Sequence, residues 1–190
     1  MPESSATALL LVDVINDLGF KGGDRLLRQA GSVANKLCRL KVRARRAGIP
    51  AIYVNDNFGG WTSDFQKIVE NASSPRSRGK SITQLLAPDP SDYFVLKPKH
   101  SGFFSSTREL ILKYLSASQL IITGFTTDSC VLFTSNDAYL RDYKLYVPRD
   151  CCTAISQIHH RRALEYMRRV LGADTRVSTE LNLVRLAARK

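Results

Sequence analysis

Cysteine and histidine are scarce in this sequence, which contains four cysteines and three histidines among 190 residues. The cysteines form no C-x-x-C pair, and the histidines complete no zinc-ligand spacing. We therefore predict neither a zinc site nor a disulfide framework, and reduced thiols suit the cytoplasm. The residues concerned are Cys38, Cys130, Cys151, Cys152, His100, His159 and His160.

Long hydrophobic runs are also missing. The longest, around residues 8–12 and 120–122, are far shorter than the roughly 20 apolar residues that a membrane-spanning helix needs. Residues 1–6 have neither the basic start nor the small-residue cleavage site of a secretion signal. We therefore expect a cytoplasmic protein with no membrane partner.

Acidic residues are outnumbered, because 17 Asp and Glu stand against 28 Lys and Arg, giving a formal net charge of +11. The basic residues are spread over many small groups, and no nucleic-acid recognition motif accompanies them. Such a balance raises the non-specific affinity for polyanions. A nucleic-acid partner is not expected, although a non-catalytic protein that recruits an acidic partner remains an alternative.

Short apolar segments alternate with amphipathic segments along the chain. The apolar segments predict strands at residues 8–12, 51–54, 93–96, 119–123 and 144–147, with a last edge strand at 175–177. The amphipathic segments predict helices at residues 25–47, 107–115, 127–141 and 156–171. This alternation is typical of parallel β-α-β units. We predict one α/β domain over residues 1–190, with a central, mainly parallel sheet flanked by helices on both faces.

Reactive side chains follow three of the predicted strands. Asp13 comes directly after the first strand and Lys97 after the third. The segment 124–130 follows the fourth strand and ends in Cys130, where a helix begins. Ligands of open parallel sheets gather outside the carboxyl ends of the strands. We therefore expect a carboxylate, an ammonium group and a thiol to converge at that edge.

Such a group of side chains suits acyl transfer. A helix start and a neighbouring Lys97 should lower the pKa of Cys130 from its ordinary value near ~8.5. Asp13 could accept the thiol proton, and backbone N–H groups could hold an oxyanion. The alternative for each residue is structural: Cys130 a small buried side chain, Asp13 a cap, and Lys97 a surface residue.

Four segments of the chain resemble a known family. They read LLLVDVINDL, AIYVNDNFGGWTSDF, VLKPKHSGFFSSTREL and LIITGFTTDSCVLFTSNDAYLRDYKLYVPRDCCTA. Together they are similar to the isochorismatase-like cysteine hydrolase superfamily, from about residue 8 to 171. The G-x-x-T-D-x-C-V sequence, followed by A-x-x-R-x-Y, is the most specific part of the resemblance. It implies a parallel sheet of about six strands and a homo-oligomer, either a dimer or a tetramer.

The resemblance also implies roles for residues. Asp13, Lys97 and Cys130 fall on the Asp-Lys-Cys triad of the family. A non-proline cis peptide maps to Phe125–Thr126, and the N–H groups of Thr126 and Cys130 map to the oxyanion hole. The substrate would be a small amide or ureido compound, cleaved at its C–N bond through a thioester.

Departures from the family narrow this interpretation. Nicotinamidases of the superfamily bind a metal through histidines after the second strand, whereas here residues 55–61 contain no histidine. We therefore expect no metal and no other cofactor. Isochorismatases cleave a vinyl ether without needing the cysteine, so Cys130 favours amide chemistry. An ether hydrolase with Asp13 as general acid remains the alternative.

Aromatic and polar residues beside these segments are candidates for a small, largely apolar pocket. His100, three residues after Lys97, could line that pocket or lie at the surface. The predicted substrate-binding residues are Phe20, Asn57, Trp61, Phe104 and Phe125.

Overall fold

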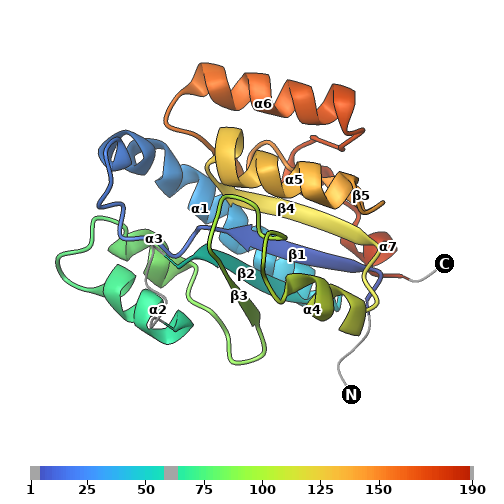
Figure 1. Ribbon diagram of the computed structural model, residues 1–190, viewed down its shortest axis with the longest axis horizontal. Helices are drawn as coiled ribbons and strands as arrows, with labels where there is room; N and C mark the ends of the chain where they lie inside the picture. Colours follow the sequence, from blue (N-terminus) through green and yellow to red (C-terminus); the bar gives the residue numbers. More distant parts are fainter. Residues whose placement is uncertain (1–4, 58–63, 189–190) are drawn as a thin grey trace.

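A six-stranded parallel sheet forms the centre of the molecule in the computed structural model, which describes residues 5–57 and 64–188 (Figure 1). The strand order is β3-β2-β1-β4-β5, and β6 pairs with β4. The strands are β1 (Thr7–Val12), β2 (Ala51–Asp56), β3 (Tyr93–Lys97), β4 (Gln119–Phe125), β5 (Lys144–Tyr146) and β6 (Cys152–Thr153). The predicted α/β class with a mainly parallel sheet is confirmed.

Helices cover both faces of this sheet, as the layers in Figure 1 show. Helices α1, α2, α3 and α7 pack on one face, and α4, α5 and α6 on the other. Their bounds are α1 (Gly23–Arg46), α2 (Phe65–Ser73), α3 (Lys80–Leu85), α4 (Arg108–Tyr114), α5 (Leu132–Tyr139), α6 (Gln157–Val170) and α7 (Leu183–Ala187). A π-helix, η1 (Thr127–Val131), precedes α5, and a 3-10 helix, η2 (Ser178–Glu180), precedes α7.

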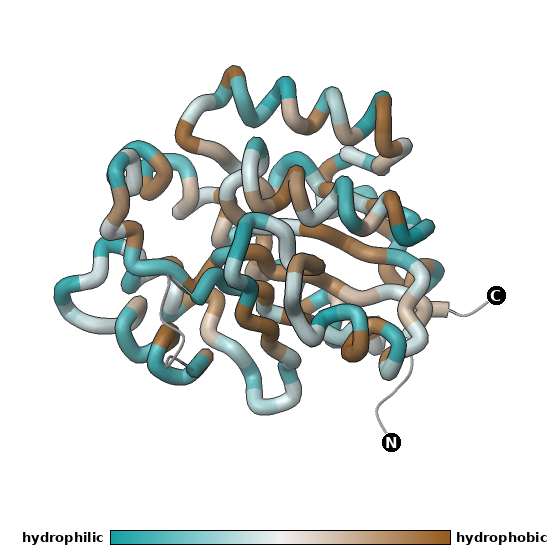
Figure 2. Tube along the Cα trace, in the orientation of Figure 1, coloured by the Kyte–Doolittle hydropathy of each residue, from teal (hydrophilic) through white to brown (hydrophobic). Residues whose placement is uncertain are grey.

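Alternating side chains of β1 separate the core into two layers. Leu9 and Leu11 point to the α1 face, whereas Ala8, Leu10 and Val12 point to the α5 face. All five are fully buried, and the hydrophobic centre they form is visible in Figure 2. Burial on both faces explains why this strand reads as a continuous apolar run instead of an alternating one.

The first helix follows the predicted pattern closely. Its buried residues recur at helical spacing along one face: Leu26, Ala30, Ala34, Leu37, Leu40 and Ala44. Gly48 lies just past its end with a φ of 73°, a left-handed conformation that favours glycine. The helix therefore begins and ends within two residues of the expected bounds.

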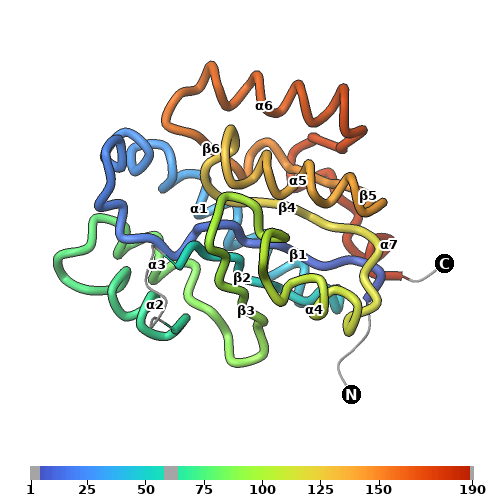
Figure 3. The backbone as a smooth tube through the Cα atoms, viewed as in Figure 1, coloured from blue at the N-terminus to red at the C-terminus, as the bar shows by residue number. Residues whose placement is uncertain are grey.

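The sixth strand is not where the sequence pattern predicted it. Residues 175–177 form no strand, and the chain near them makes only an isolated bridge between Tyr146 and Asp174. The Asp174 carboxylate instead accepts hydrogen bonds from the backbone and side chain of Arg176, which turns the chain locally. Cys152 and Thr153 supply the sixth strand by pairing with the end of β4, next to which β6 lies in Figure 3.

Two further differences concern helices. The predicted helix 127–141 begins as the π-helix η1 and ends at Tyr139. Helices α2 and α3 were not predicted at all. Asp64 begins α2 by accepting a hydrogen bond from the Lys67 N–H group, and α2 buries only Phe65, Ile68 and Ala72, too few to give a clear helical pattern in the sequence.

Gly124 and Asp13 both have a positive φ, and both lie where β1 and β4 approach each other at the carboxyl edge of the sheet. Gly124 has a φ of 114°, and a Cβ atom there would lie 2.0 Å from the Val12 carbonyl oxygen. Asp13, the next residue after Val12, has a φ of 51° and donates its N–H to the Val54 carbonyl. The chain around Asp13, where it leaves β1, therefore lies in contact with both β2 and β4.

None of the helices in the described part of the chain is both long and apolar enough to cross a membrane.

Candidate active site

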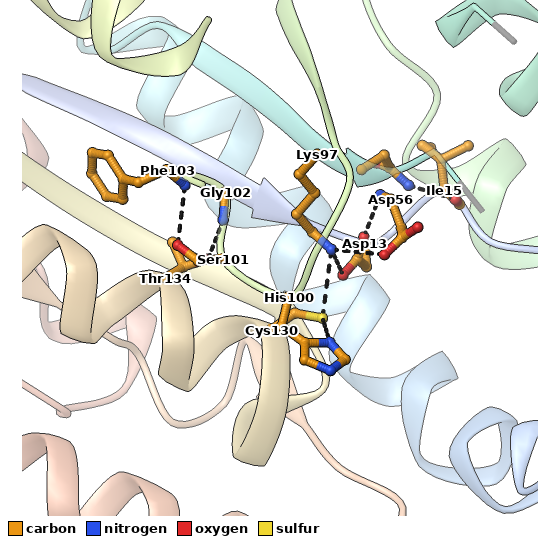
Figure 4. A network of polar contacts seen from close by, with 11 residues as sticks. Asp13, Ile15, Asp56, Lys97, His100, Ser101, Gly102, Phe103, Cys130 and Thr134 are labelled. Atoms are coloured by element: carbon orange, nitrogen blue, oxygen red, sulfur yellow. Dashed lines mark hydrogen bonds and ion pairs between the residues drawn. The ribbon is translucent and has the colours of Figure 1, made fainter. Parts of the chain in front are cut away.

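Three strands deliver a carboxylate, an ammonium group and a thiol to one point (Figure 4). Lys97 Nζ lies 2.9 Å from Asp13 Oδ2 and 3.6 Å from Cys130 Sγ. It also lies 3.4 Å from Oδ2 of Asp56 at the end of β2. The structure therefore brings together the three residues that were predicted to converge.

Both carboxylate oxygens of Asp13 have partners in this cluster. Its Oδ1 accepts a 2.7 Å hydrogen bond from the Asp56 N–H group, while Oδ2 faces Lys97. Burial raises the pKa of Asp13 above its ordinary value, although the Lys97 ammonium group opposes that change. A carboxyl group with a raised pKa is a better proton acceptor and donor near neutral pH.

Lys97 is a fully buried cation. Burial works to lower its pKa, but the neighbouring carboxylates of Asp13 and Asp56 contribute to raising it. The side chain therefore remains an ammonium group and neutralises part of the negative charge around it.

The Cys130 thiol is protonated in the resting protein, contrary to the prediction. Burial and the adjacent Asp13 carboxylate raise its pKa to about 12, and the Lys97 ammonium group only partly offsets them. The prediction was wrong in direction because it counted the helix start and Lys97, whereas burial and the carboxylate have the larger effect.

The peptide bond between Phe125 and Thr126 is cis, as the resemblance implied. The Thr126 carbonyl then accepts hydrogen bonds from the N–H groups of Ser129 and Val131, which shape η1 around Cys130. His160 of α6 further fixes the start of η1, because its Nδ1 lies 2.8 Å from the Thr127 hydroxyl. Burial lowers the pKa of His160, so the ring stays neutral in this contact.

The predicted substrate-binding residues have different surroundings. Phe20 and Phe104 are exposed, with 40% and 53% of their surface accessible. Asn57 is buried, and its N–H donates to the Lys97 carbonyl at the end of β3. Phe125 is buried in the core on the α1 face. Trp61 lies outside the described residues, and contact with a substrate stays a prediction for all five.

Two residues of the site had no firm role in the sequence. Asp56 both braces Asp13 through its backbone and pairs with Lys97 through its side chain. His100 Nδ1 lies 3.7 Å from Cys130 Sγ. The only available signals were the position of Asp56 at a strand end and that of His100 three residues after Lys97.

Within residues 5–57 and 64–188, no group of three or more His, Cys, Asp or Glu side chains is arranged to hold a metal ion.

The fold and the site together define an isochorismatase-like cysteine hydrolase. The Isochorismatase domain model matches residues 7–178, and the chain belongs to this family. The predicted family resemblance is thereby confirmed.

Relatives and solved structures agree with this assignment. The chain is 38% identical over 177 residues to the uncharacterized isochorismatase family protein YaaI of Bacillus subtilis, covering 93% of this chain and 96% of that protein. It is 27% identical to the ureidoacrylate amidohydrolase RutB of Methylorubrum extorquens, covering 74% of this chain and 67% of that protein. The N-carbamoylsarcosine amidase structure from Thermoplasma acidophilum is 25% identical, with a TM-score of 0.71 over 93% of this chain and 98% of that one.

Proposed function

We propose that this protein hydrolyses the C–N bond of a small amide or ureido compound through a thioester on Cys130. The observation that carries the proposal is the buried Lys97 ammonium group, which contacts the Asp13 carboxylate and the Cys130 thiol at once. The names of two similar proteins, a ureidoacrylate amidohydrolase and an N-carbamoylsarcosine amidase, support this substrate class.

The first half of the proposed reaction forms the thioester. Asp13 accepts the Cys130 proton while the sulfur attacks the carbonyl carbon, so that no free thiolate is needed beforehand. The N–H groups of Thr126 and Cys130 stabilise the oxyanion. As the C–N bond breaks, Asp13 returns the proton to the departing nitrogen, which leaves as ammonia or an amine.

The second half consumes water. A water molecule attacks the thioester carbon, the C–S bond breaks, and the acid product leaves while Cys130 regains a proton. Lys97 keeps Asp13 in place and limits the build-up of negative charge in both halves. We further propose that the reaction takes place in the cytoplasm, where the four cysteines, all free in the structure, would stay reduced.

The test is ammonia release from ureidoacrylate and from N-carbamoyl amino acids, measured for the wild type and for Cys130→Ala. We expect the substitution to reduce turnover to the rate without enzyme and to leave the fold unchanged by circular dichroism. Cys38→Ala, which removes a half-buried thiol of α1, is the matched control and should keep full activity. An undiminished rate in Cys130→Ala would contradict the proposal.

Hydrolysis of a vinyl ether is a second candidate, favoured by the raised pKa of Asp13, which also suits a general acid. The two reactions differ in their need for the thiol. Complete alkylation of Cys130 stops amide hydrolysis, whereas an ether hydrolase that uses only Asp13 keeps its activity.

A further inference from the structure

The Cys130 sulfur has a second polar neighbour besides Lys97. His100 Nδ1 lies 3.7 Å from Sγ, close to the 3.6 Å that separates Sγ from Lys97 Nζ. Figure 4 shows the imidazole and the Lys97 ammonium group on different sides of the sulfur. The two neighbours also differ in access to water, because Lys97 is fully buried whereas His100 is exposed.

The chain around His100 is anchored. The Ser101 hydroxyl donates to the Asp137 carboxylate of α5, and the Gly102 N–H donates to the Thr134 hydroxyl at 3.1 Å. The imidazole itself packs against Phe133, with ring centroids 5.6 Å apart. These contacts tie the segment after β3 to α5 and hold Nδ1 near the sulfur.

The proposed reaction needs a base for the water that breaks the thioester. Asp13, which serves the first half of the reaction, is buried, whereas His100 is exposed and lies 3.7 Å from the sulfur. Solvent water can therefore reach the imidazole of His100 directly. Histidine is also the side chain best suited to exchange protons near neutral pH.

We propose that His100 is a further catalytic residue, which activates the hydrolytic water in the second half of the reaction. Nδ1 accepts one proton of the water as its oxygen bonds to the thioester carbon. The C–S bond then breaks, the electron pair stays on sulfur, and the imidazolium group returns its proton to Cys130. This inference rests on the proposed function, since it requires a thioester on Cys130.

The experiment uses p-nitrophenyl acetate as an activated acyl donor, so that formation and breakdown of the thioester are measured separately. The wild type should release a burst of p-nitrophenolate equal to the enzyme concentration, followed by slower turnover. His100→Asn keeps a polar atom near the position of Nδ1 but cannot accept a proton at neutral pH. We expect it to keep the burst and to lose about 100-fold in the steady rate, the lower end for general base catalysis.

Two further readouts separate catalysis from a structural role. Acetylated Cys130 should accumulate in His100→Asn and be detectable by mass spectrometry of the intact chain. The steady rate of the wild type should rise with pH, because a base must be unprotonated to accept the proton of the water, and His100→Asn should lose that rise. The groups that face the ring are the Cys130 thiol from η1 and Phe133 from α5, with Lys97 behind the thiol.

The matched control is His159→Asn, which changes an exposed histidine on α6 and should leave burst and steady rate unchanged. If Cys130→Ala abolishes the burst while His100→Asn leaves the steady rate and its pH dependence intact, the proposed function stands and this inference is overturned. If burst and steady rate fall together in His100→Asn, a role confined to the second half is overturned as well. A wild type without a Cys130-dependent burst counts against both proposals.

Discussion

At the scale of single residues, the charge balance around the thiol explains its resting state. Asp13 and Asp56 place two carboxylates within 3.4 Å of the single Lys97 ammonium group. Ionising Cys130 would add another negative charge to a site in which burial already disfavours ions. The sulfur is therefore kept neutral until a substrate carbonyl is within reach.

This balance predicts how Cys130 reacts with iodoacetamide. Because its pKa is raised to about 12, alkylation should be slow at pH 7 and accelerate only as the pH approaches 12. Asp13→Asn removes the carboxylate that raises the pKa, so alkylation at pH 8 should become faster. Lys97→Met removes the cation that lowers the pKa, so alkylation should become slower still. Mass spectrometry of all four cysteines measures each rate, with Cys38 as an internal reference.

The substitutions separate the present interpretation from the opposite one. Fast alkylation of wild-type Cys130 at pH 7 would show that Lys97 dominates over burial. A slower reaction in Asp13→Asn would show that the carboxylate acts as a base on the free thiol, instead of raising its pKa.

The convergence of Asp13, Lys97 and Cys130 at one edge of the sheet could be predicted, because strand ends can be read from the sequence. Asp13 and Lys97 directly follow apolar runs, and Cys130 follows a run that ends in Gly124. The direction of the Cys130 pKa could not be predicted, because it depends on how deeply the thiol is buried and on its contact with Asp13. The short distance between His100 and Cys130 could not be predicted either, because it depends on hydrogen bonds that tie the segment after β3 to α5.

At the scale of secondary-structure elements, the contact between β1 and β4 sets the shape of the carboxyl edge. Gly124→Ala should destabilise the protein by more than about 3 kcal/mol, because the new Cβ would meet the Val12 carbonyl oxygen at 2.0 Å. Urea unfolding followed by circular dichroism measures the free energy of unfolding.

Gly31→Ala provides the matched control for this substitution. Gly31 lies within α1, and a Cβ atom added there would meet no atom within 4 Å. Alanine favours the helix over glycine, so a gain of about 0.5–1 kcal/mol is expected there. Equal effects of the two substitutions would contradict the role assigned to the close approach of β1 and β4.

Elements with strong periodicity were predictable and marginal ones were not. Helix α1 repeats its apolar residues over 24 residues, so its pattern is unambiguous. Strand β6 has two residues and exists only because it meets the end of β4, a contact that no local pattern encodes. The composition of residues 175–177 is typical of a strand. The Asp174 carboxylate, however, accepts a hydrogen bond from the Arg176 N–H group, and the pairing with β5 does not extend beyond the bridge at Asp174.

At the scale of the whole molecule, the net charge of +11 should govern non-specific binding without governing catalysis. We expect weak binding to duplex DNA in low salt, with the same affinity for unrelated sequences. The affinity should fall steeply as salt rises to physiological concentration, because binding releases counterions. Fluorescence anisotropy with two unrelated duplexes measures this. A strong preference for one duplex at physiological salt would contradict this expectation and favour a non-catalytic binding protein.

Assembly into a homo-oligomer stays a prediction.

The position of β3 at one end of the strand order has a consequence for inactivation. An edge strand pairs with a single neighbour, and such elements open at a lower free energy than the centre of a sheet. Lys97, the last residue of β3, leaves the site whenever this edge opens. Mild heat or denaturant should therefore inactivate the enzyme before the sheet as a whole unfolds. Hydrogen exchange would then show slow exchange of the amide protons in most of the sheet.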